Sequence, residues 1–392
     1  MSNLVAPSRG FDREEFAQRT EKLQRAMLEK NIDAVFFCTE PEFRYFSGFK
    51  SQFWESPTRP WFLVVPSSGV PIAVVPEIGV AGFDETWIED VRSWPSPRPE
   101  DDGISQLAQT LNECSVKHKR IGAMLGPETH LRMPANNYQQ LCTMLKGCET
   151  VDISLDMRLI RSVKSAAEIA KTRFSCEVTA AGFEYLKDHL RIGMTEREAC
   201  KLMHIEMLRL GADSCPYLIS ASGRGGYDNI IMGPTDRVLS EGDILIIDTG
   251  ACFDGYFSDY DRNYAFASTT AQSVAAYDAV YQSTEAGLNI AAPGRTTGDV
   301  WQAMWTVMEK AGALGNDVGR MGHGLGMQLT EWPSNVEGGD VVLEPGMILT
   351  LEPGMTFAAN KMMVHEENIV ITENGCEMLH QRAWREMPII SR

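Results

Sequence analysis

Two aspartates stand in the stretch over residues 244–266, ILIIDTGACFDGYFSDYDRNYAF, and their surroundings are apolar. An apolar strand ends at Asp248, a turn containing Asp and Gly follows, and a second strand carries Asp259, which we expect to lie opposite Asp248. Carboxylates buried there must be protonated, meet a cationic side chain or bind a metal. The hairpin alone leaves two interpretations, turn residues that pair with Arg262 or metal ligands.

Three further segments downstream carry metal-binding residue types. His323 lies between glycines in GHGLG, Glu352 follows an apolar strand in TLEPG, and Glu366 precedes the strand NIVIT. Two Asp, one His and two Glu form a ligand set for two divalent ions with oxygen and nitrogen preference. Two such ions activate a water molecule for hydrolysis.

These residues and their spacing resemble the pita-bread metallohydrolases, metallopeptidase family M24, which include methionine aminopeptidase, aminopeptidase P, prolidase and creatinase. In prolidase-type spacing, the five metal ligands of the family fall on Asp248, Asp259, His323, Glu352 and Glu366. Residues 157–169, MRLIRSVKSAAEI, resemble the segment that joins the two domains of the prolidase and creatinase branch. The resemblance implies a fold of mixed α/β and α+β class, with a creatinase-type amino-terminal α/β domain over residues 1–160 and a pita-bread catalytic domain over residues 161–392.

The resemblance also implies roles and partners. Glu352 becomes the general base, because the equivalent glutamate of the family both binds metal and accepts a proton, and His323 becomes a ligand and catalytic residue. The cofactors are two divalent ions, Mn, Co, Fe or Zn. A homodimer is expected, in which amino-domain loops approach the active site of the partner, so Trp54 becomes a substrate-binding residue; plain surface anchoring is the alternative.

Other substrate contacts follow from loops. Arg224 and Tyr227 lie in the Gly-rich segment GRGGYDN, for which substrate binding and ordinary turn chemistry are equal alternatives. Glu331 lies in TEWP, where prolidases have His-Glu-x-Pro, and it is also assigned to substrate binding.

The chain departs from the peptidases of the family at three polar positions. A histidine that contacts substrate is replaced by Ile231, a second catalytic histidine by Thr330, and an arginine by Val364. Thr330 and His365 are therefore considered as substitutes in catalysis. The first functional hypothesis is an Xaa-Pro dipeptidase-like hydrolase, the second is C–N bond hydrolysis or elimination on a small nitrogen- or sulfur-containing metabolite, and the third is a non-catalytic peptide-binding module.

Composition limits the class of protein. The 392 residues are 44% hydrophobic, which suffices for two or three domains. There is no apolar run of membrane-spanning length, and the nine cysteines show no CxxC pattern, so we expect a cytoplasmic protein with reduced thiols. A net charge of −17 argues against nucleic acid and anionic membranes as partners and leaves a dipeptide or another small molecule as substrate.

Periodicity predicts the main elements around these residues. Helices are expected from Asp12, from Ser165 to about Leu190 and after Thr195, and strands over residues 34–38, 61–65, 71–75 and 217–222.

Overall fold

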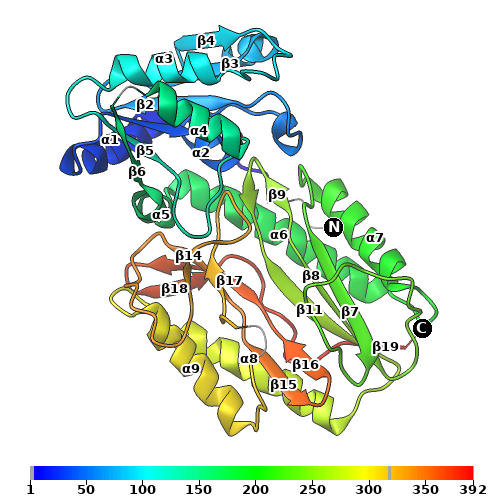
Figure 1. The fold of residues 1–392 in the computed structure, drawn as a ribbon. Helices are drawn as coiled ribbons and strands as arrows, with labels where there is room; N and C mark the ends of the chain where they lie inside the picture. Colours follow the sequence, from blue (N-terminus) through cyan, green and yellow to red (C-terminus); the bar gives the residue numbers. More distant parts are fainter. Residues whose placement is uncertain (1–3, 146, 317–318, 392) are drawn as a thin grey trace. The chain divides into compact units, whose positions relative to one another are not determined.

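The computed structural model describes residues 4–145, 147–316 and 319–391. The described chain divides into two compact units, one of residues 8–161 and one of residues 162–391 together with residues 4–7 (Figure 1). The predicted domain boundary after residue 160 falls next to this division. Residues 4–7, which we assigned to the first domain, group instead with the second unit.

The first unit is a sheet of six strands in the order β4-β3-β2-β1-β5-β6. β1 is buried along its whole length because its four residues, AVFF, are apolar on both faces. It pairs antiparallel with β2 and parallel with β5, which confirms the predicted strands in this half. The strands are β1 (Ala34–Phe37), β2 (Phe62–Pro66), β3 (Ile72–Pro76), β4 (Asp90–Trp94), β5 (Arg120–Ala123) and β6 (Glu149–Asp152).

Five α-helices accompany this sheet. The first begins as predicted, because the side chain of Asp12 accepts a hydrogen bond of 2.8 Å from the backbone N–H of Glu15. The helices are α1 (Arg13–Glu29), α2 (Glu40–Ser47), α3 (Ile104–Cys114), α4 (Ala135–Met144) and α5 (Ser154–Ser162), with short 3₁₀ turns η1 (Phe53–Glu55) and η2 (Glu77–Phe83).

The second unit holds four helices, and two of them begin at the predicted caps. Ser165 and Thr195 each form a capping box, with Glu168 and Glu198 respectively, so both helices begin at these residues. The helices are α6 (Ala166–His189), α7 (Glu196–Leu210), α8 (Ala271–Ile290) and α9 (Thr297–Lys310).

The strands of this unit form two larger sheets and two ribbons. The first sheet has the order β19-β11-β8-β7 and the second β13-β12-β14-β17-β18. The strands of the first are β7 (Leu218–Arg224), β8 (Asp243–Thr249), β11 (Tyr260–Phe266) and β19 (Ile389–Ile390), and those of the second are β12 (His323–Gly324), β13 (Glu331–Ser334), β14 (Ile348–Leu351), β17 (Glu367–Thr372) and β18 (Gly375–Met378). The ribbons are β9 (Cys252–Phe253) with β10 (Tyr256–Phe257), and β15 (Gly354–Ala358) with β16 (Lys361–Val364).

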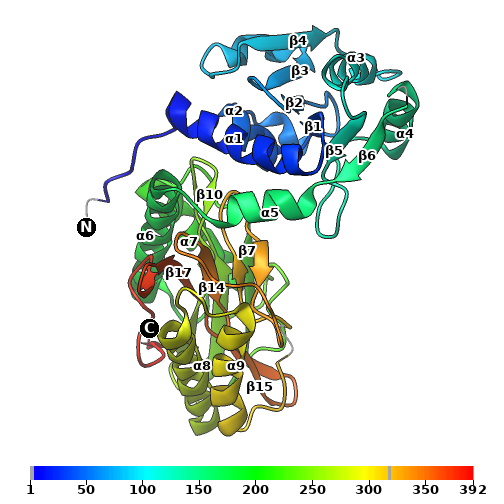
Figure 2. The ribbon, with the colours of Figure 1, turned by 90° about the vertical axis from the view of Figure 1, so that its left-hand side faces the viewer.

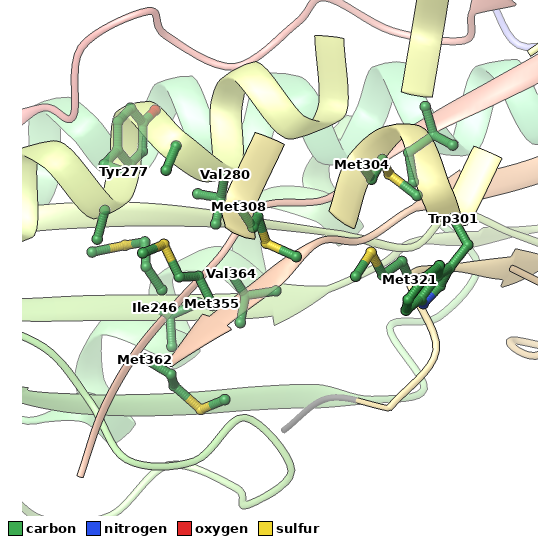
Figure 3. Close-up of a cluster of buried hydrophobic side chains, with 14 of the residues drawn as sticks. Ile246, Tyr277, Val280, Trp301, Met304, Met308, Met321, Met355, Met362 and Val364 are labelled. Atoms are coloured by element: carbon green, nitrogen blue, oxygen red, sulfur yellow. The ribbon is translucent and has the colours of Figure 1, made fainter. Parts of the chain in front are cut away.

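Helices α6 and α7 pack on one hydrophobic cluster, and α8 and α9 pack on another. Along β8, Leu245 and Ile247 pack in a cluster with residues of α6 and α7, whereas Ile244 and Ile246 pack in a cluster with residues of α8 and α9. Figures 1 and 2 show α8 and α9 side by side along the strands, and Figure 3 shows the methionine-rich cluster beneath them. Side chains of a strand alternate between its faces, so Asp248 shares the face of Ile246.

The register of the central hairpin differs from our prediction. Asp254 and Gly255, both at positive φ, form a two-residue turn between β9 and β10. This turn fixes the pairing of β8 with β11, in which Asp248 lies opposite Asp261 and not opposite Asp259. The expectation for Asp259 was wrong by two residues, which leaves it on the same face.

Candidate metal centre

The five predicted ligands come from both sheets of the second unit. Asp248 lies near the end of β8, Asp259 precedes β11, His323 is in β12, Glu352 follows β14 and Glu366 precedes β17. One potential ligand atom from each of Asp259, His323 and Glu366 lies within 4.8 Å of the others, and all three residues are buried. Three of the five predicted ligands therefore meet at one point inside the unit.

The other two ligands belong to the same electrostatic cluster. Burial, together with the charges of Asp259 and Glu352, raises the pKa of Asp248 well above its ordinary range. Burial raises the pKa of Glu352 to about 7, against the charge of His323, which lowers it. Asp248 and Glu352 have intermediate exposure, whereas Asp259, His323 and Glu366 are buried.

Two acids of the cluster have buried oxygens without hydrogen-bond partners among the described residues. These oxygens are Oδ1 of Asp248 and Oε1 of Glu366. Burial and then the neighbouring carboxylates raise the pKa of Glu366 well above its ordinary range. Burial of carboxylate oxygens without partners costs free energy, and a bound divalent cation removes this cost. The residues present therefore fit a metal centre.

His323 is held in an orientation suited to a ligand. Its Nδ1 lies 2.8 Å from the carbonyl oxygen of Gly324, and as the donor there it leaves Nε2 for the cluster, where Nε2 is 3.3 Å from Oδ2 of Asp259. Burial alone would lower the pKa of His323, but the hydrogen bond to Asp259 raises it. The preceding Gly322 has φ of 109°, and a Cβ there would meet the backbone oxygen of Thr350 at 2.1 Å. Glycine is therefore required where the histidine enters the site.

Asp259 is fixed by two residues that the sequence analysis did not single out. Its backbone N–H donates to Oδ1 of Asn368 over 3.0 Å, and Nδ2 of Asn368 donates to its carbonyl oxygen. The hydroxyl of Tyr217 donates to its Oδ1. Burial and the charges of Asp259 and Asp248 raise the pKa of Tyr217 well above its ordinary range, so this hydroxyl stays protonated as a donor.

His365, predicted to be catalytic, lies among residues of α8. Its Nδ1 is 2.8 Å from Oγ1 of Thr284, and its Nε2 is 3.5 Å from Glu367. Its ring also contacts Tyr277 and Tyr281. Burial lowers the pKa of His365 to about 3. These contacts hold His365 against α8, and its catalytic role stays a prediction.

Thr330 and Glu331, the first two residues of the TEWP segment, have different surroundings. Thr330 is exposed, and its hydroxyl accepts a hydrogen bond of 3.3 Å from Arg320. Burial raises the pKa of Glu352, and the charge of Arg320 is one of those that lower it. Glu331 forms a buried ion pair of 3.1 Å with Lys164, and its role in substrate binding stays a prediction.

Of the loop residues, Tyr227 is committed to the core. It is 1% exposed, and its hydroxyl donates to Asn263 over 3.0 Å and accepts from the backbone of Val364 over 2.8 Å. Arg224 and Ile231 are exposed. Tyr227 is thus a packing residue, whereas Arg224 remains available to a ligand.

Trp54 belongs to the first unit and is buried there. Its ring packs against Phe43 at 5.3 Å and Trp61 at 6.2 Å, whereas the neighbouring Phe53 is 47% exposed. The anchoring interpretation therefore holds for Trp54, and Phe53 is the exposed aromatic residue of this loop.

The comparisons with known proteins agree with the resemblance seen in the sequence. The family model described as metallopeptidase family M24 matches residues 170–373, and the model described as the creatinase/prolidase N-terminal domain matches residues 19–163. The chain belongs to metallopeptidase family M24. Family membership and the prolidase relatives make it a metal-dependent hydrolase of the peptidase type, with a creatinase-type domain followed by the M24 domain.

Similar proteins match over nearly the whole length. The probable dipeptidase PepE of Mycobacterium tuberculosis is 27% identical over 94% of this chain and 95% of its own, and the Xaa-Pro dipeptidase of Pyrococcus furiosus is 23% identical over 92% and 97%. The solved structure of dipeptidase PepE from Mycobacterium ulcerans has a TM-score of 0.84 at 26% identity, covering 98% of this chain and 100% of the other. Among the described residues, no helix has the length and hydropathy needed to cross a membrane.

Proposed function

We propose that this M24 protein is a dinuclear metal-dependent dipeptidase that cleaves Xaa-Pro dipeptides. The observation that carries the proposal is the meeting of Asp259, His323 and Glu366 within 4.8 Å, beside buried oxygens of Asp248 and Glu366 that have no hydrogen-bond partner among the described residues. We propose Asp248, Asp259, His323, Glu352 and Glu366 as the ligands. The relatives named as dipeptidases support the substrate class.

The side chains of the chain supply the other steps. Divalent ions, when bound, lower the pKa of water and polarise a substrate carbonyl. Glu352 accepts a proton from the attacking water and returns it to the leaving nitrogen. Tyr217 keeps Asp259 oriented, and we propose that Arg320, whose charge acts on Glu352, pairs with the carboxylate of a dipeptide.

A second candidate function is hydrolysis of a C–N bond in a small non-peptide compound. The observation that favours it is the surroundings of Thr330 and Ile231, which replace two histidines of the peptidases. Thr330 is exposed and bonded to Arg320, and Ile231 is 79% exposed, so neither position supplies a titratable group to the cluster. Loss of a general acid or base removes about 10²–10⁴ of the rate.

The test is hydrolysis of Xaa-Pro dipeptides by the purified chain with Mn²⁺ or Co²⁺ added, beside the variant Asp248→Ala. Turnover that depends on the ions and is lost in the variant supports the dipeptidase. Metal binding without turnover of any Xaa-Pro dipeptide refutes it and selects the second candidate, for which a panel of small amides and amidines is the next substrate set. A protein that binds peptides, but binds no metal and hydrolyses none of the peptides, would be a binding module instead.

We also propose a cytoplasmic homodimer with Mn²⁺ as an acceptable ion. Sedimentation at several concentrations measures the oligomeric state, and Phe53→Ser tests whether the loop over residues 51–60 contributes to a partner's site. A loss of activity in this variant at unchanged dimerisation supports the contribution, and unchanged kinetics remove it.

A further inference from the structure

We propose that Asp261 is a sixth carboxylate of the metal centre and binds a divalent ion on the side of Asp248. The inference rests on the proposed metal centre and adds a ligand to its five. It concerns the residue that the observed register of the hairpin brings opposite Asp248.

The backbone places Asp261 on the face of the cluster. Asp248 and Asp261 are direct partners across β8 and β11, so their side chains leave the sheet on the same side. Asp259 lies two residues away and shares this side, whereas Tyr260 packs in the cluster of α6 and α7 on the other. Three aspartates thus line one side of one hairpin.

The carboxylate of Asp261 is buried, and one of its oxygens has no hydrogen-bond partner within the described part of the chain. The residue is 2% exposed, and this oxygen is Oδ1. The adjacent Arg262 does not neutralise it by an ion pair, because its guanidinium donates to Glu367 at 3.0 Å and to the backbone oxygens of Glu366 at 3.0 Å and Asp261 at 2.7 Å. The guanidinium of Arg262 therefore donates to Glu367 and to backbone oxygens, while its charge still acts on Asp261.

The carboxylates that share the side of Asp261 are those of the centre, with Asp248 opposite it in the strand pair and Asp259 two residues along the chain. A buried carboxylate that faces other carboxylates costs several kcal/mol unless a cation joins them. The four acids of the five-ligand set balance two divalent ions, so Asp261 adds one negative charge and strengthens the hold on the ion near Asp248.

The experiment is a calorimetric titration of the metal-stripped full chain with Mn²⁺, comparing the wild type with Asp261→Asn and Asp261→Thr. Both substitutions remove the charge, and Asn keeps the shape. We expect one of the two binding steps to weaken about 10–100-fold in each variant while the other step is unchanged. Asp340→Asn, which makes the same chemical change at an exposed position, should bind as the wild type does.

The outcomes separate this inference from the proposed function. If both variants bind Mn²⁺ in the same two steps as the wild type, with unchanged affinities, Asp261 is not a ligand. The five-ligand centre then remains as proposed. A wild-type chain that takes up no Mn²⁺ refutes the centre as a whole. Asp248→Asn should weaken the same step as Asp261→Asn, and the double variant should lose less than the two single losses combined.

Discussion

Replacement of Glu352 by glutamine should stabilise the metal-free protein at alkaline pH and destabilise the metal-loaded protein. The pKa of Glu352 is about 7 in the folded protein, against an ordinary value of 4.5, because burial disfavours its charge. Between these two values the folded state binds more protons than the unfolded chain, so the free energy of unfolding falls as the pH rises. Above pH 7 the loss is complete, and below pH 4.5 it is absent.

The size of the effect follows from the shift. The difference between the two pKa values corresponds to at most about 3 kcal/mol, and partial exposure of Glu352 reduces it to about 1–3 kcal/mol. In a unit of this size each kcal/mol moves the melting temperature by about 2–4 °C. Glu352→Gln should therefore melt about 3–10 °C above the wild type at pH 8 without metal, and at the same temperature near pH 4.5.

The assay is thermal melting of both proteins from pH 4.5 to 8.5, with chelator and then with Mn²⁺. A free Mn²⁺ concentration of about 100 times the dissociation constant adds about 2.7 kcal/mol per site to the free energy of unfolding. The variant loses part of this gain because it lacks a ligand. The order of the two melting temperatures should therefore reverse when metal is added. Glu344→Gln, at an exposed position, is the matched control. A wild type that remains more stable than Glu352→Gln at pH 8 with chelator would refute the reasoning.

Three further substitutions test the support of the centre. Lys171→Met leaves the buried carboxylate of Asp254 without its ion pair of 2.7 Å and should cost about 3–5 kcal/mol in denaturant unfolding; a loss below 1 kcal/mol would contradict this. Asn368→Ala removes the hydrogen bonds to the backbone of Asp259 and should cost about 2–3 kcal/mol in the same experiment, with an unchanged midpoint as the opposing result. Tyr217→Phe should weaken Mn²⁺ binding about tenfold in a calorimetric titration while the metal-free melting temperature changes little, and equal affinities would remove Tyr217 from the site.

The sequence predicted several helices and strands, and three of the proposed ligands meet in the structure. Capping residues predicted the starts of α6 and α7, and an Asp-Gly pair predicted the turn of the hairpin, because these features depend on neighbouring residues only. The opposite partner of Asp248 was also readable, since a two-residue turn at Asp254 and Gly255 fixes every pair of the hairpin. That count gives Asp261, and our prediction placed Asp259 there instead.

The remaining differences depend on distant contacts. His365 stands next to a ligand in the sequence, yet its surroundings come from Thr284 and the tyrosines of α8. Glu331 matches a substrate-binding motif, but Lys164 from another part of the chain pairs with it. The sequence offered one signal for the orientation of His365. Side chains alternate along an extended segment, so the neighbours of Glu366 must point away from the side on which Glu366 lies.

The measurement that tests the account most directly is the metal content per subunit, determined by elemental analysis after dialysis against Mn²⁺, for the wild type and for Asp259→Ala. Asp259 belongs to the group that meets within 4.8 Å, so its loss should affect the whole centre. We predict two ions per subunit in the wild type and fewer than one in the variant. A wild type without bound ions, or a variant with the same content as the wild type, would contradict the metal centre.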